Sequence, residues 1–105
     1  MLRVCALVVD LMDRSRITAS LPDAVFVRDA AACAGADVVI VDLARSGKQV
    51  SAVRSAAQAA RIVCFGPHVD DEGASAALAE GADIVLPRSR FFRDPAGAIA
   101  ALPPR

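Results

Sequence analysis

The sequence predicts an α/β domain in which one parallel β-sheet carries helices on both faces. Short runs rich in Val and Ile recur along the chain, and their apolar residues are continuous instead of alternating with polar ones. Continuous runs are typical of strands that are buried on both faces of a parallel sheet. Segments with helical character separate these runs, so strand and helix alternate five times. This alternation indicates right-handed crossovers and a doubly wound sheet.

The five apolar runs define the predicted strands and their order. We expect the strands at residues 4–9, 25–27, 38–41, 62–65 and 84–86. We expect the order 2-1-3-4-5, in which the first and third strands are neighbours where the order reverses. Side chains at the carboxyl ends of the strands then converge on a crevice at this point.

The segments between the strands define the predicted helices. They are expected at residues 12–21, 28–34, 48–60, 71–80 and 95–102. Pro22 ends the first helix, and Pro95 suits the first turn of the last one. The fourth begins with acidic residues, which favour the positive end of a helix dipole. Gly35 and Gly81 stand in two similar helix-to-strand turns and are expected to adopt left-handed conformations.

Length, charge and cysteine content restrict the class of protein. With 105 residues, we expect a single domain spanning residues 1–105. The 12 basic and 12 acidic residues are balanced, which argues against a nucleic-acid partner. No apolar stretch approaches the roughly 20 residues of a membrane span. Cys5, Cys33 and Cys64 lack the CxxC spacing of metal or redox sites, so we expect buried thiols in a cytoplasmic protein.

Acidic side chains follow two strands that are expected to be neighbours. Asp10 and Asp13 follow the first strand, and Asp42 follows the third. Because the carboxyl ends of parallel strands meet at the same edge of the sheet, these carboxylates are expected to lie close together. Oxygen ligands of this kind suit Mg²⁺, so Asp10, Asp13 and Asp42 are a candidate metal site.

Three segments of the chain resemble the receiver domains of two-component response regulators, which have a flavodoxin-like fold. Residues 7–10 resemble the first strand of a receiver with its acidic residue, and residues 38–43 resemble the strand that carries the phospho-accepting aspartate. Residues 81–88 resemble the Gly-Ala-Asp strand that ends in the lysine of receivers. The resemblance covers nearly the whole chain and implies Asp42 as the candidate phospho-acceptor. It also implies a signalling function that depends on contact with another protein, and not an enzyme.

The chain departs from the receiver pattern at the residues that would perform phosphorylation. Leu11 stands where receivers have a second adjacent acid, so only Asp13 is left to replace it. Gly66 stands where receivers have a hydroxyl residue, and Arg88 aligns with the receiver lysine. We therefore predict a degenerate receiver in which Gly66 and Arg88 occupy the switch positions. No cofactor is required, and Mg²⁺ is expected only if Asp42 is phosphorylated.

Arg88 is predicted to pair with a carboxylate of the crevice. Its planar guanidinium would bind Asp42 or Asp10 in a bidentate manner, and Asp42 has Arg45 as a further candidate partner. The interval between Asp10 and Asp42 is shorter than in typical receivers, so the first or second helix is expected to be stunted.

Arginine and phenylalanine side chains predict an interaction surface after the last strand. Arg88, Arg90, Phe91 and Phe92 lie within six residues, and this composition is typical of protein interfaces. We expect a strand-to-helix loop here, with one Phe pointing inward and the other exposed. The predicted partner is a kinase, a regulatory protein or a second copy of the chain.

Several alternatives remain open from the sequence. The alternatives to a degenerate receiver are a phosphorylatable stand-alone receiver that uses Asp42 and a small-ligand-binding module that uses the same crevice. His68 is a candidate ligand or acid-base group, although a solvated loop histidine is the simpler interpretation. Asp70, Asp71 and Glu72 suggest a metal cluster with His68, but their position favours capping of the following helix.

Overall fold

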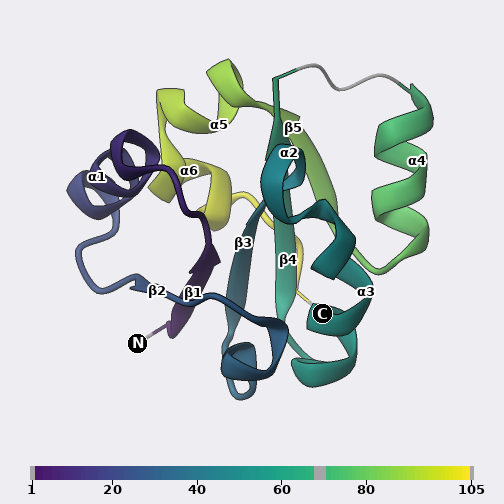
Figure 1. Cartoon of the computed structure of the whole chain (residues 1–105). Coiled ribbons are helices and arrows are strands. Elements are labelled where there is room, and N and C mark those ends of the chain that lie inside the picture. Colours follow the sequence, from purple (N-terminus) through teal and green to yellow (C-terminus); the bar gives the residue numbers. More distant parts are fainter. Residues whose placement is uncertain (1, 68–70, 105) are drawn as a thin grey trace.

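The predicted sheet and its strand order are confirmed. The computed structural model describes residues 2–67 and 71–104. Its sheet has five strands in the order β2-β1-β3-β4-β5, and all neighbouring strands are parallel (Figure 1). The strands are β1 (Val4–Leu7), β2 (Val25–Phe26), β3 (Val38–Asp42), β4 (Arg61–Gly66) and β5 (Ile84–Pro87).

Both faces of the central strands are buried, which explains their continuous apolar sequences. In β3, Val39 and Val41 face one hydrophobic core, whereas Val38 and Ile40 face the other. All four side chains are inaccessible to solvent. Because successive side chains of a strand point to opposite faces, a strand that contacts two cores needs apolar residues at every position.

Helices cover both faces of the sheet, as Figure 1 shows. One face carries α1 (Leu11–Ser20), α5 (Arg88–Arg93) and α6 (Pro95–Ala100), with Ile17, Phe91 and Ile99 in the core. The other face carries the 3₁₀ turns η1 (Ala30–Cys33) and η2 (Gly47–Gln49) with α2 (Leu43–Ser46), α3 (Val50–Ala56) and α4 (Asp71–Ala79).

Several elements differ from the prediction. The stunted helix is confirmed at residues 30–33, where a single 3₁₀ turn that Asp29 caps replaces a helix. The helix predicted at residues 48–60 consists of η2 and α3 and ends earlier, at Ala56. The helix α2, which was not predicted, precedes them directly after Asp42. The predicted loop after the last strand is instead the helix α5. The first strand ends at Leu7, and Val9 is exposed instead of buried.

The two glycine turns adopt the predicted left-handed conformation. Gly35 has a φ of 82° and Gly81 a φ of 122°. At Gly81, an added Cβ would lie 2.8 Å from Arg54 Cβ and Cγ. Gly81 is therefore required both by its backbone conformation and by the close approach of Arg54.

Candidate functional site

Three aspartates and one arginine gather at the carboxyl edge of the sheet, the edge at which the parallel strands end. Asp10 precedes α1 and caps it by accepting a hydrogen bond from Asp13 N at 3.0 Å. Asp13 lies in the first turn of α1. Asp42 ends β3 and caps α2 by accepting from Ala44 N at 3.0 Å. Arg88 begins α5 directly after β5.

Arg88 pairs with Asp13 in a bidentate manner. Its Nη1 donates to Asp13 Oδ2 at 2.9 Å, and its Nη2 donates to Asp13 Oδ1 at 2.6 Å. The predicted bidentate geometry is confirmed, but the predicted partner, Asp42 or Asp10, is wrong. Asp10 and Asp42 each accept a backbone hydrogen bond as the N-cap of the helix that follows them, α1 and α2. Asp13 lies within the first turn of α1, where its side chain reaches Arg88 at the start of α5.

The pair is asymmetric in its exposure to solvent. The side chain of Asp13 is 4% exposed, and that of Arg88 is 34% exposed. A buried carboxylate without a partner would lose its hydration without compensation, and Arg88 supplies the counter-charge and the hydrogen bonds that Asp13 needs inside the protein. The hydrogen bonds to Asp13 and the charges of all three aspartates in turn raise the pKa of Arg88 above its ordinary value.

Aromatic rings fix the guanidinium of Arg88 from its other sides. Its central carbon lies 5.5 Å from the ring centroid of Phe65 and 5.1 Å from that of Phe92. Phe65, Phe91 and Phe92 form a cluster in which each pair of ring centroids is 5.0 Å apart. Cation–π contacts of this kind favour a planar guanidinium over an ammonium. Phe65 at the end of β4 is a site residue that sequence reasoning did not identify.

The predicted interaction surface is corrected by this packing. Phe91 points inward as expected, with no exposed surface, so it cannot contact a partner. Phe92 is partly buried against the same core instead of exposed. Both rings are held because residues 88–93 form a helix that lies on the sheet. Arg90 is exposed, and Arg88 is occupied by Asp13.

The two capping aspartates experience opposite electrostatic environments. The hydrogen bond from Asp13 N lowers the pKa of Asp10 below its ordinary value, and Arg45 and Arg88 act in the same direction. Burial raises the pKa of Asp42, and the charge of Asp13 adds to this effect. The hydrogen bond from Ala44 N and the charges of Arg88 and Arg45 only partly offset the burial. Asp42 is 3% exposed, so little of its surface is open to a reagent.

The carboxylates do not fit the coordination of Mg²⁺. Both oxygens of Asp13 accept hydrogen bonds from Arg88, and one oxygen of Asp42 is directed at Ala44 N. Among residues 2–67 and 71–104, no group of three His, Cys, Asp or Glu side chains is arranged to hold a metal ion. Arg88 therefore already occupies both oxygens of Asp13, one of the three carboxylates of the predicted metal site.

Gly66 leaves the end of β4 without a side chain. A Cβ added there would lie 3.7 Å from Leu43 Cβ, an ordinary van der Waals distance, so steric exclusion does not explain the glycine. The candidates His68 and Asp70 lie outside the described residues. Asp71 and Glu72 are exposed in the first turn of α4, where acidic side chains complement the helix dipole.

The fold is that of the receiver domains of response regulators. The chain is similar to the chemotaxis protein CheY4 of Vibrio cholerae, with a TM-score of 0.83, 20% identity and coverage of 98% of this chain and 99% of that one. It is similar to a response regulator of Hahella chejuensis, with a TM-score of 0.75, 27% identity and coverage of 96% and 91%. A response regulator of Thermotoga maritima gives a TM-score of 0.79 at 10% identity, with coverage of 95% of both chains. No protein-family model and no curated protein sequence matches the chain.

The helices and the cysteines of the described residues can also be compared with the expectations from the sequence. No helix in this part of the chain has the length and apolar character that crossing a bilayer requires. Cys5, Cys33 and Cys64 are free and buried, as predicted. Burial raises the pKa of Cys64 to about 12 and that of Cys33 to about 11, which makes these two thiols poor nucleophiles.

Proposed function

We propose that this protein is a degenerate receiver that signals through protein contact without being phosphorylated and without catalysing a reaction of its own. The bidentate pair of Arg88 with Asp13 carries the proposal. In this pair, a permanent positive charge neutralises an acid of the crevice within the protein itself. Arg88 thus supplies a fixed charge arrangement where other receivers use a lysine and a metal-bound phosphoryl group.

The surroundings of Asp42 support the same proposal. A phospho-acceptor must present its carboxylate to a phosphodonor in the ionised form. Asp42 is buried, caps α2 with Oδ1, and has a raised pKa. Gly66 offers no hydroxyl to contact a phosphoryl oxygen, and Asp13 is bound by Arg88. Each departure removes one group that phosphorylation would need. Asp42 then serves the structure as the N-cap of α2.

The position of Asp42 favours a second candidate function, that of a phosphorylatable receiver. Asp42 ends β3, the strand of the sheet that in receivers carries the phospho-accepting aspartate. Phosphorylation of this side chain would require Arg88 to release Asp13 and would require Mg²⁺ to enter the crevice. The degenerate receiver is favoured because the pair is short, bidentate and supported by two aromatic rings.

Treatment with acetyl phosphate or beryllofluoride in the presence of Mg²⁺ tests the proposal. We expect no adduct by intact-mass spectrometry and no Mg²⁺-dependent shift of the amide resonances or of Tm. A stoichiometric adduct that disappears in Asp42→Asn would overturn the proposal and establish the phosphorylatable receiver.

A reconstruction of the missing groups provides the positive counterpart. The triple variant Leu11→Asp, Gly66→Ser, Arg88→Lys restores the adjacent acid, the hydroxyl and the lysine of receivers. Space for the serine is available beside Leu43. We expect this variant to be stabilised by beryllofluoride with Mg²⁺, and the same variant with Asp42→Asn to show no response. A wild-type chain that responds as strongly as the triple variant would contradict the proposed loss of phosphorylation.

A further inference from the structure

We propose that a hollow between α1 and the end of α5 binds a small anion that carries a phosphate group. None of the aspartates of the crevice lines this hollow, and neither does Arg88. The binding therefore goes beyond the proposed function and does not depend on phosphorylation of Asp42. The charge, the hydrogen-bond donors and the volume of the hollow support the proposal.

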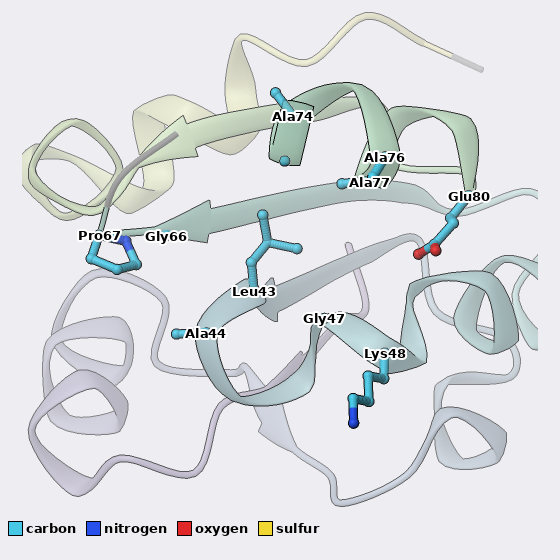
Figure 2. Close-up of a pocket in the computed structure, with 11 residues that line it drawn as sticks. Leu43, Ala44, Gly47, Lys48, Gly66, Pro67, Ala74, Ala76, Ala77 and Glu80 are labelled. Atoms are coloured by element: carbon cyan, nitrogen blue, oxygen red, sulfur yellow. The ribbon is translucent and has the colours of Figure 1, made fainter. Parts of the chain in front are cut away.

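Two hollows of similar volume differ in the chemistry of their walls. The hollow between α2 and α4, of about 450 Å³, has mostly small residues on its walls, and Figure 2 shows Lys48 and Glu80 as its charged residues. These two charges offset each other, so the lining selects no class of ligand. The hollow between α1 and the end of α5, of about 420 Å³, is bordered instead by two arginines, Arg16 and Arg93. In Figure 1, α1 and α5 lie on the same face of the sheet.

Within the described part of the chain, the two arginines beside this hollow form no ion pair. Arg16 lies on α1 and Arg93 ends α5, and both are exposed. The ion pairs of the described residues are those of Arg54 and Arg88. Arg90, one helical turn before Arg93, is also exposed and lies beside a neighbouring hollow that Arg93 borders as well. The positive charge gathered here favours an anion.

Asp94 is the acidic residue among those that line the hollow, and its carboxylate is turned toward α6. Its Oδ1 accepts a hydrogen bond from Gly97 N at 3.0 Å as the N-cap of this helix. Its Oδ2 lies so close to Gly97 that a Cβ added there would clash with it. The two arginines outnumber this one carboxylate, so the lining keeps a net positive charge.

An aromatic ring positions the guanidinium of Arg16. Its central carbon lies 5.7 Å from the ring centroid of Phe92. Phe92 is held in turn by edge contacts with the buried rings of Phe65 and Phe91. A guanidinium that lies over a ring keeps its N–H groups available for an anion. Because Arg16 is already positioned, less conformational freedom is lost when a ligand binds.

Ser20 provides a third donor, a hydroxyl group in the last turn of α1. Its Oγ accepts a hydrogen bond from Ala96 N at 3.0 Å, so its hydroxyl hydrogen is left for another acceptor. Ser20 follows Arg16 by four residues, which places both side chains on one face of α1. Two guanidiniums and one hydroxyl from two different helices therefore border the hollow.

This set of donors fits a phosphate group better than a carboxylate. A terminal phosphate presents three oxygens that point in different directions, and it can accept from donors on both helices. A carboxylate has two oxygens in one plane, which a single guanidinium can bind. A volume of about 420 Å³ lies in the range of small-molecule sites and leaves room for the organic part of a phosphate ester.

Titration of the ¹⁵N-labelled full chain with inorganic phosphate and with glycerol 3-phosphate tests the proposal. EDTA is present, so Mg²⁺-dependent chemistry at Asp42 cannot contribute, and the ionic strength is constant. We expect saturable shifts of the amide resonances of residues 16–20 and 92–97, with a Kd on the order of 1 mM. No saturable shift up to about 20 mM of either probe would refute the site.

Acetate and glycerol are the matched control ligands. Acetate has the charge of an anion without the third oxygen, and glycerol has the organic part without the phosphate. Neither is expected to produce saturable shifts at these residues. Binding of acetate as tight as that of phosphate would overturn the assignment to a phosphate group.

Substitution of the two arginines identifies the groups that bind. Arg16→Gln and Arg93→Gln each remove one guanidinium and are expected to weaken the binding by about tenfold or more. Arg28→Gln is the matched control, because Arg28 is exposed but does not line the hollow, and Kd should stay within about twofold. An equal loss in all three variants would indicate unspecific attraction by surface charge and overturn the proposal.

Asp94→Asn should change the affinity in the opposite direction. Asparagine keeps the oxygen that accepts from Gly97 N but removes the negative charge, so phosphate should bind about twofold to fivefold more tightly. Weaker binding in this variant would contradict the proposed site. Binding that is lost in Arg88→Gln but persists in Arg16→Gln would place the anion in the crevice and overturn the proposal as well.

Discussion

Two arginine–carboxylate pairs lie at opposite ends of the sheet, and their arginines bind different kinds of acceptor. At the amino edge, Arg54 pairs with Asp83 at 3.0 Å and also donates to the carbonyl oxygens of four residues. Those residues are Ala57, Gln58, Ala60 and Gly81. At the carboxyl edge, Arg88 donates hydrogen bonds to the carboxylate of Asp13 and lies against the aromatic rings of Phe65 and Phe92.

The difference distinguishes a pair that also supports the main chain from a pair formed between side chains alone. Arg54 satisfies main-chain carbonyls of two turns, and Asp83 accepts a further hydrogen bond from Ile62 N at 2.7 Å. Loss of Arg54 leaves backbone groups without partners, so its position is dictated by the fold. Arg88 donates to the side chain of Asp13 and not to the main chain, so a substitution at both positions would leave no backbone group without its donor. The pair lies at the carboxyl edge of the sheet, where receivers perform their chemistry.

The largest effect is expected from Arg54→Ala. The substitution removes the donor to four carbonyl oxygens and the partner of Asp83. We expect the free energy of unfolding to fall by about 3 kcal/mol, because several partly buried acceptors lose their donor at once. Urea denaturation measures the change. Arg28→Ala, at an exposed arginine, is the control and should stay within about 0.5 kcal/mol of the wild type.

Arg88→Ala is expected to have the next largest effect. It leaves the buried carboxylate of Asp13 without a counter-charge, which we expect to lower the free energy of unfolding by about 2 to 3 kcal/mol. The loss should be smaller than for a fully buried pair because Arg88 is partly exposed. An unchanged or improved stability would show that the pair does not contribute.

The partner of Arg88 can be verified by a double variant. Asp13→Asn removes the charge that Arg88 compensates, so the combination with Arg88→Ala should be less destabilised than Arg88→Ala alone. Asp10→Asn combined with Arg88→Ala is the matched control, and no such recovery is expected there. A recovery with Asp10 instead of Asp13 would place the pair where the sequence had first suggested it.

Arg88→Lys separates charge from geometry at the carboxyl edge. A lysine keeps the positive charge but loses the bidentate contact and most of the stacking on Phe65 and Phe92. We expect a loss of about 1 kcal/mol in the free energy of unfolding. Arg54→Lys should cost more, since one ammonium cannot reach all the carbonyl oxygens that Arg54 binds. Equal losses at both positions would remove the distinction between the two pairs.

The smallest effect, and one of opposite sign, is expected from Asp42→Asn. Burial raises the folded-state pKa of Asp42, so the ionised form is less stable in the folded than in the unfolded chain. Relative to higher pH, the folded chain has its full stability below the unfolded-state pKa of about 3.9, where Asp42 is protonated in both states. This stability is lost as the pH rises through the higher folded-state pKa, because the folded chain must then bury a charge. Asparagine still accepts from Ala44 N.

The gain from Asp42→Asn should therefore depend on pH. We expect an increase of at most about 1 kcal/mol at pH 7, and no increase near pH 3.5. Thermal unfolding followed across this range measures it. A destabilised variant at pH 7 would mean that Arg88 and Arg45 compensate the charge of Asp42 fully.

Local sequence was sufficient to predict the strands and their order. Each strand is a short continuous apolar run, and a run such as residues 38–41 is typical of a strand that is buried on both faces of a parallel sheet. The prediction was less accurate for helices that start immediately after a strand. Residues 43–46 and 88–93 lack a long apolar stripe and are short, so their helical state depends on packing against the sheet.

The sequence by itself determined that Asp10, Asp13, Asp42 and Arg88 lie at one edge of the sheet, because the carboxyl ends of parallel strands share an edge. Only the tertiary structure decided that Arg88 binds Asp13, since the choice among three nearby acids depends on helix rotation and on the aromatic rings beneath the guanidinium. Side-chain directions of this kind follow from packing between segments far apart in the chain, for which a local pattern contains no information.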